Sequence, residues 1–168
     1  MKKFKAVRPE TLKLNPFKLI GSDWMLITAG DPANFNTMTA SWGSLGVMWG
    51  KPAAFCVVRP SRHTYGFMEK NSLFSLSFFD RKYRKALEFC GSKSGRDTDK
   101  IKATGLTPVT GPAGSVCFEQ ARLVLECRKI YFQDYNPSKF LDPEIRKAYP
   151  NGDYHRLYIG EILRCLVK

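Results

Sequence analysis

The sequence predicts a mainly β protein, an antiparallel β-barrel with peripheral helices. Apolar residues alternate with polar ones at a period of two in Phe74–Phe78 and again in Arg122–Arg128, a pattern typical of strands that are buried on one face. Short polar stretches separate the segments, as in a closed or partly closed barrel. Strands do not alternate regularly with long helices, so an α/β doubly wound sheet fits poorly.

Five segments are predicted as strands. Ala53–Val58 is a short apolar run that we expect to be buried on both faces. Gly160 is expected to mark a bulge or a close approach of the backbone within the last strand. In chain order the segments are Trp24–Thr28, Ala53–Val58, Phe74–Phe78, Arg122–Arg128 and Tyr154–Val167.

Three short helices are predicted between the strands. Asp80 is placed to cap a helix that runs to about Cys90, with apolar side chains on one face and basic ones on the other. Ser61 is placed to cap a second helix through about Lys70, and a third is predicted over Pro143–Ala148. Such helices would cover the ends of the barrel.

Length and composition indicate one globular domain over residues 1–168. Hydrophobic residues make up 43% of the chain, enough for a core without disulfides or metals. The net charge of +12 is spread along the chain, which favours a site for phosphorylated small molecules over nucleic acid binding. No apolar run approaches a membrane span, and none follows Met1-Lys2-Lys3, so we expect a cytoplasmic protein without a signal peptide.

The five cysteines are expected to be buried, reduced thiols. They are odd in number and form no Cys-x-x-Cys motif: Cys56, Cys90, Cys117, Cys127 and Cys165. For Cys90, beside Gly91, partial exposure is the alternative. Neither His63 nor His155 has a partner at metal-ligand spacing, so no metal site is expected.

The most informative stretch is Asn36–Trp42, which packs three hydroxyls, one amide and small side chains into a short span. Small residues let a ligand lie against the backbone, and hydroxyl and N–H groups then face it. Such a surface suits a flat ring system with polar edges. Aromatic residues such as Trp42, Trp49 and Phe118 are more often part of a core than contacts of a cofactor.

Two basic segments follow this stretch. Arg59–Thr64 comes after a buried strand and opens a helix, whose first-turn N–H groups and flanking arginines would receive a phosphate. In Lys93–Lys100, Gly95 would allow a turn with positive φ, and Asp97 or Asp99 would cap the segment that comes next. The ordinary alternatives are a capped helix with solvated arginines and a common surface loop.

Four motifs occur in a characteristic order. They are Asn-Thr-Met-Thr-Ala-Ser-Trp at 36–42, Arg-Pro-Ser-Arg-His-Thr at 59–64, Ser-Gly-Arg-Asp-x-Asp-Lys at 94–100 and His-Arg-Leu-Tyr-Ile-Gly-Glu-Ile at 155–162. In this order they resemble the flavin reductase-like FMN-binding family, and its flavoredoxin-type members in particular. The likeness covers roughly residues 15 to 168. The chain has no Gly-x-Ser-x-Gly elbow, Rossmann turn or P-loop.

The resemblance implies a split β-barrel, usually a homodimer, that holds FMN or FAD noncovalently near the dimer interface. It places the isoalloxazine ring against Asn36–Trp42 and the phosphate and ribityl chain against the two basic segments. The residues implied to contact the cofactor are Asn36, Thr37, Met38, Thr39, Ala40, Ser41, Trp42, Arg59, Ser61, Arg62, His63, Thr64, Lys93, Ser94, Gly95, Arg96 and Lys100.

His155 matches a histidine that precedes the last strand in this family, and the resemblance implies that it lies near the flavin or the nicotinamide. We therefore expect His155 to guide a reductant to an exposed ring face. One departure from NADH:flavin reductases is the insert Lys139–Pro150, which is more like flavoredoxin-type members. The insert leaves the electron donor open.

Three interpretations of function follow. The first is an FMN-dependent oxidoreductase that takes hydride from NAD(P)H and passes electrons onward, the redox chemistry belonging to the flavin. The second is a nonenzymatic carrier of the flavoredoxin kind that exchanges electrons with a redox protein partner. A third, remote interpretation is a basic barrel that binds nucleic acid. None of the three involves a membrane partner.

Overall fold

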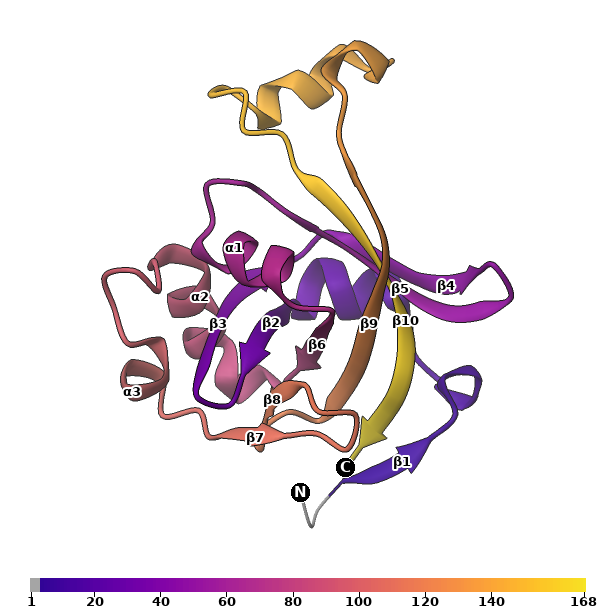
Figure 1. Cartoon of the computed structure of the whole chain (residues 1–168), viewed down its shortest axis with the longest axis vertical. Coiled ribbons are helices and arrows are strands. Elements are labelled where there is room, and N and C mark those ends of the chain that lie inside the picture. The colour runs from indigo at the N-terminus through magenta and orange to yellow at the C-terminus, as the bar shows by residue number, and fades with distance from the viewer. Residues whose placement is uncertain (1–3) are drawn as a thin grey trace.

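The computed structural model describes residues 4–168 and is organised around one antiparallel sheet (Figure 1). Its strand order is β3-β2-β6-β9-β10-β5-β4, with β1 paired to β10. The strands are β1 (Lys5–Val7), β2 (Met25–Asp31), β3 (Asn34–Ala40), β4 (Gly43–Met48), β5 (Lys51–Val58), β6 (Leu73–Phe78), β9 (Leu123–Asp134) and β10 (Arg156–Val167). A separate hairpin joins β7 (Pro108–Thr110) to β8 (Val116–Phe118). The prediction of a mainly β fold is confirmed.

The α-helices are short and lie at the β2–β3 end of the sheet. Figure 1 shows α1 (His63–Lys70), α2 (Arg84–Ser92) and α3 (Lys100–Thr104) beside β2 and β3. The irregular helices are η1 (Pro9–Thr11), η2 (Phe17–Asp23), η3 (Arg81–Tyr83), η4 (Pro137–Lys139) and η5 (Pro143–Ala148). The segment that carries η4 and η5 projects from the ends of β9 and β10, away from the rest of the molecule (Figure 1).

Among residues 4–168, no helix is long and apolar enough to cross a membrane.

Two predicted helix caps are wrong. Arg62 occupies the N-cap of α1, and the Ser61 hydroxyl instead donates to Asp153 Oδ2 at 3.1 Å. Asp80 precedes the 3-10 turn η3 and makes no side-chain cap there. In both cases a tertiary contact or a tighter turn replaces the local hydrogen bond that the sequence pattern favours.

The predicted strands occur, with shifted ends. The segment expected over Arg122–Arg128 continues as β9 to Asp134, and the last strand begins at Arg156, two residues after Tyr154. Gly160 lies where the β10–β9 register shifts, as predicted. A methyl group added to Gly160 would lie 2.5 Å from the ring of Phe74, so the backbone approach is also close.

Side chains of β2 alternate between two hydrophobic clusters. Ile27 belongs to the larger one, with Phe74 and Tyr158, whereas Leu26 packs into a second one with Leu87 of α2. Both faces of β2 are therefore covered, one by the interior of the barrel and the other by α2 and the β7–β8 hairpin.

Burial settles several expectations about individual side chains. All five cysteines are buried free thiols, and this includes Cys90. Phe118 is fully buried, as expected. Trp42 and Trp49 are not core residues, because 48% and 60% of their surfaces are exposed.

Candidate functional site

Three predicted segments that lie far apart in sequence meet around adjoining cavities. The first, which we call the histidine cavity, has a volume of about 150 Å³ and is lined by Met38, Thr39, Ala40, Ser41, Trp42, Val57, Arg59, Arg62 and His155. The second, the lysine cavity, has a volume of about 110 Å³ and is lined by Met38, Ser61, Arg62, His63, Thr64, Ser92, Lys93, Ser94, Gly95 and Lys100. Met38 and Arg62 line both, so the two cavities are neighbours.

A third cavity extends the histidine cavity toward α2, and together the three cavities form one groove. The third cavity has a volume of about 330 Å³ and shares Thr39, Ala40, Ser41 and Arg62 with the histidine cavity. The groove thus follows the end of β3, with the loop after β5 on one side and α2 on the other. Of the predicted site residues, Asn36, Thr37 and Arg96 line neither the histidine nor the lysine cavity.

Lys100 brings a buried positive charge to the lysine cavity. Only 6% of its surface is exposed, and its ammonium donates to the carbonyls of Thr37 at 2.7 Å and Cys90 at 2.9 Å. None of the ion pairs found among residues 4–168 includes Lys100. Burial lowers its pKa from the ordinary value. A buried ammonium with no carboxylate partner favours an anion in the space beside it.

Local structure explains how Lys100 is held. It is the first residue of α3, and Asp99 caps this helix by accepting from the N–H groups of Ile101 and Lys102. Of the two candidates for this cap, Asp97 and Asp99, the structure therefore selects Asp99.

Asn36 connects the segments without lining the cavities. Its amide donates to Thr64 Oγ1 at 2.7 Å, which ties β3 to the first turn of α1. Gly95 packs directly against this amide, and an added methyl group would overlap Asn36 Oδ1. Gly95 is not among the glycines with positive φ, so that prediction is wrong. The position requires glycine for the close approach instead.

Two of the three hydroxyls in Asn36–Trp42 are bonded inside the protein. Thr37 Oγ1 lies 2.9 Å from Thr28 Oγ1, and Thr39 Oγ1 donates to the carbonyl of Leu87. Thr37 is buried and lines none of the three cavities, so its hydroxyl does not face the groove as expected. Thr39 still lines the histidine cavity and its extension, with its hydroxyl bonded to the first turns of α2. Ser41 follows the end of the strand and lines the groove.

Arg59 and Ser61 are joined to the segment between β9 and β10, which contains the predicted insert and Asp153. The guanidinium of Arg59 lies 2.7 Å from Asp153 Oδ1 and donates to the carbonyl of Ala148 at 2.7 Å. Ser61 donates to the other oxygen of the same carboxylate. Sequence reasoning missed Asp153, which lies 94 positions from Arg59 and carries no local motif. Arg62 is held differently, by donating to the carbonyl of Gly91 at 2.8 Å.

His155 lies in an aromatic enclosure at the end of the histidine cavity. Its ring centroid is 5.2 Å from that of Trp42, 5.5 Å from Tyr149 and 6.4 Å from Tyr135. Burial, reinforced by the positive charge of Arg59, lowers the pKa of His155 to about 4. The imidazole is therefore neutral near pH 7. Sequence reasoning missed Tyr135 and Tyr149, although the segment between β9 and β10 holds several aromatic residues.

The remaining predicted residues lie at the rim of the lysine cavity. His63 and Lys93 line it, and the His63 ring packs edge-on against Phe67 at 5.2 Å. Ser94 also lines it, and its Oγ accepts from the backbone N–H of Arg96 at 3.2 Å. No group of three or more His, Cys, Asp and Glu side chains that could hold a metal ion occurs within residues 4–168.

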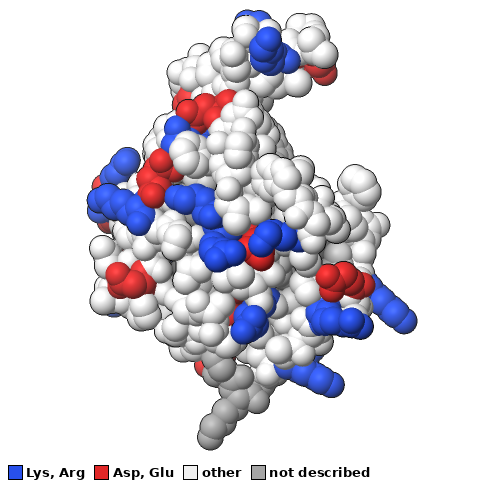
Figure 2. All heavy atoms as spheres, turned by 45° about the vertical axis from the view of Figure 1, so that its right-hand side comes forward, with Lys and Arg blue, Asp and Glu red and all other residues white. Residues whose placement is uncertain are grey.

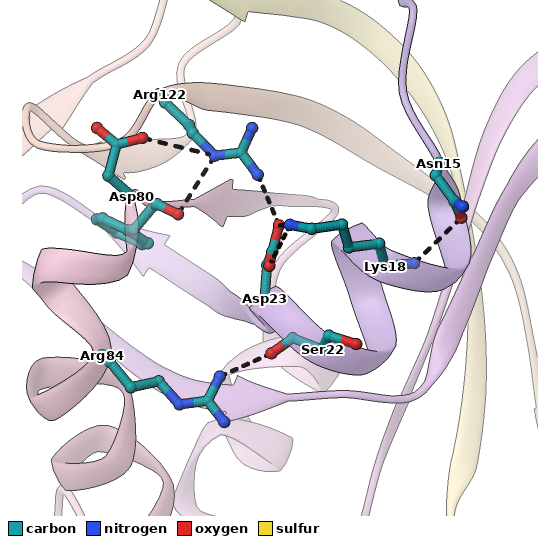
Figure 3. A network of polar contacts seen from close by, with 8 residues as sticks. Asn15, Lys18, Ser22, Asp23, Asp80, Arg84 and Arg122 are labelled. Atoms are coloured by element: carbon teal, nitrogen blue, oxygen red, sulfur yellow. Dashed lines mark hydrogen bonds and ion pairs between the residues drawn. The ribbon is translucent and has the colours of Figure 1, made fainter.

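A larger cavity of about 600 Å³ lies beside the first turns of α2 and is lined by Arg84 and Leu87 of that helix. Its charged side chains are largely paired with one another (Figure 3): Asp23 accepts from Lys18 at 2.8 Å and from Arg122 at 3.0 Å. Arg84 donates to the carbonyl of Ser22 at 2.7 Å. Because these cations already have partners, we regard the network as a structural clamp between η2 and α2.

Comparison with known proteins agrees with the geometry. A family model described as "Flavin reductase like domain" matches residues 17–168. The chain belongs to the flavin reductase-like family. Its mostly β fold is the split barrel of that family. A sequence comparison with curated proteins gives no match.

Solved structures of this family superpose over most of the chain. An FMN-binding protein from Thermus thermophilus has a TM-score of 0.70 and 20% identity, covering 98% of this chain and 82% of its own. A flavoredoxin from Methanosarcina acetivorans has a TM-score of 0.69 and 21% identity, with 94% and 75% covered. An NADH:FAD oxidoreductase from Streptomyces globisporus has a TM-score of 0.64 and 18% identity, with 87% and 74% covered.

Proposed function

We propose that this flavin reductase-like protein binds FMN and acts as a flavin-dependent oxidoreductase. The observation that carries the proposal is Lys100, a buried ammonium beside the lysine cavity that has no carboxylate partner among residues 4–168. A phosphate there would supply the missing negative charge. The residues present therefore fit the phosphate end of a flavin nucleotide.

Further donors support a phosphate at this end. Arg62 lines the lysine cavity, and α1 starts directly after it, without a side-chain cap. The first-turn N–H groups of a helix have no intrahelical partners and carry a positive partial charge. An anion at this point receives backbone donors and a guanidinium together.

The histidine cavity and its extension toward α2 suit the ring. They adjoin the lysine cavity through Met38 and Arg62, so one elongated ligand would occupy both ends. Ala40 and Ser41 offer a wall of small residues, and Trp42 offers a half-exposed aromatic surface. When bound, the flavin supplies the electron-transfer chemistry. The chain binds the phosphate, orients the ring and limits access to it.

Two versions of this function differ in the electron donor. The likeness to an NADH:FAD oxidoreductase favours an enzyme that accepts hydride from NAD(P)H, and the likeness to flavoredoxins favours an electron carrier with a redox protein partner. FAD in place of FMN is compatible with either version.

Nucleic acid binding is disfavoured, because basic side chains are interspersed with acidic ones on the face shown in Figure 2 rather than gathered into a patch.

Flavin titration tests the proposal. We expect the purified protein to bind FMN with a visible flavin spectrum, and anaerobic NADH or NADPH to bleach that spectrum. Binding without bleaching would favour the carrier, and a bound flavin that only a reduced redox protein bleaches would establish it. Failure to take up FMN or FAD would remove the proposal.

A further inference from the structure

The two ring nitrogens of His155 have different surroundings. Nδ1 lies 2.8 Å from the hydroxyl of Tyr149. No hydrogen bond to Nε2 is found among residues 4–168. Within the same residues, Ser77 Oγ is the only buried side-chain oxygen or nitrogen without a partner. Nε2 is therefore accessible, and His155 lines the histidine cavity.

Tyr149 is held firmly against this histidine. Only 5% of its surface is exposed, and its ring stacks on Phe140 with centroids 5.8 Å apart. The guanidinium of Arg59 covers the ring at 4.8 Å from its centroid. Burial raises the pKa of Tyr149, so the phenol keeps its proton.

The hydrogen bond has a defined direction. A neutral imidazole carries a proton on one nitrogen and a lone pair on the other. Among residues 4–168, His155 Nδ1 is the only hydrogen-bond acceptor found for the buried hydroxyl of Tyr149. If Nδ1 carried the proton, the phenol proton would have no acceptor, and unsatisfied buried donors are costly. The hydroxyl therefore donates to Nδ1, and the ring proton sits on Nε2.

We propose that Tyr149 is a positioning residue that fixes His155 as its Nε2–H tautomer, so that the histidine presents a hydrogen-bond donor to the cavity. The consequence rests on the proposed flavin site: the donor would meet a carbonyl oxygen or an unprotonated ring nitrogen of the bound ring or of its redox partner. His155 then orients a neutral acceptor and does not act as a base.

Nitrogen NMR of the full chain reads the tautomer directly, because the sequence holds only two histidines. In flavin-free protein labelled with ¹⁵N-histidine at pH 7, we expect His155 to show a protonated Nε2 and a bare, hydrogen-bonded Nδ1. Tyr149→Phe should shift the Nδ1 resonance and leave His63 unchanged. Tyr135→Phe is the matched control, since the Tyr135 ring faces His155 at 6.4 Å without a hydrogen bond to it.

Two results would overturn the inference. One is a wild-type spectrum with the proton on Nδ1, and the other is an Nδ1 resonance that Tyr149→Phe does not move. Flavin titration separates this test from the proposed function. We expect Tyr149→Phe to bind FMN as the wild type does, with reduction by NADH slowed several-fold. If the wild type binds no flavin, the proposed function fails while the tautomer result stands.

Discussion

The guanidinium of Arg59 and the carboxylate of Asp153 form an ion pair of 2.7 Å at the edge of the candidate flavin site. Ser61 bonds to the same carboxylate. The family resemblance places Arg59 and Ser61 at the phosphate, yet both side chains are already bonded to the carboxylate of Asp153. Lys100, in contrast, bonds only to backbone carbonyls within the described residues. Of these residues, Lys100 is therefore the better candidate to bind the phosphate of the proposed flavin nucleotide.

Asp153→Asn should tighten FMN binding. Neutralising the carboxylate releases Arg59 and removes a negative charge near the ligand. The gain should be a few-fold, because a partly exposed ion pair contributes about 1 kcal/mol or less. Quenching of flavin fluorescence measures the dissociation constant. Asp134→Asn, which removes a different ion pair with Arg156, is the control. Weaker binding would show that Asp153 positions Arg59 for the ligand.

Lys100→Met should weaken FMN binding about 10- to 150-fold, since a charged hydrogen bond contributes about 1.5–3 kcal/mol. The substitution keeps most of the side-chain volume and removes the buried charge. Lys102→Met changes an exposed lysine on the same helix and should leave the affinity unchanged. Calorimetric titration of both variants gives the comparison. Equal affinities would remove Lys100 from the phosphate site.

Gly95→Ala should weaken FMN binding with little loss of stability. The added methyl group meets the amide of Asn36, which is fixed by its bond to Thr64, so the loop around residue 95 must move. Gly66→Ala in α1 has open space for its methyl group and serves as the control. Flavin affinity and the urea unfolding midpoint should be measured together. A parallel loss of both would indicate general damage to the fold.

His155 should make the protein less stable as the pH falls. Its pKa is lowered from 6.5 to about 4 in the folded chain. Between these values the unfolded chain binds a proton that the folded chain does not, so the free energy of unfolding decreases toward acid. The loss amounts to roughly 3 kcal/mol at most. His155→Gln should flatten this part of the curve in urea unfolding at pH 7, 5.5 and 4.5. Parallel curves would contradict the lowered pKa.

Particular residues show how far local patterns reach. The alternation in Phe74–Phe78 correctly predicted the strand β6, because the period of a strand is a property of its own residues. The expectation that only one face of it is buried is wrong, because Ser75 and Ser77 are fully buried as well. The hydroxyl of Thr37 was assigned to the groove but is buried against Thr28, and that of Thr39 lines the groove while bonded to α2. Their direction depends on which elements cover β3, and those elements come from elsewhere in the chain.

The sequence by itself determined the mainly β fold, the family and the segments that meet at the site. Periodicity and ordered motifs are properties of short stretches of residues, so they can be recognised without the tertiary structure. Only the tertiary structure decided which charges in those segments are already paired and which remain free. The segment between β9 and β10 brings Asp153 to Arg59 and Tyr149 to His155, and no spacing rule in the sequence predicts either contact. Hydrogen bonds and ion pairs depend on distances of a few ångströms, which long-range packing sets.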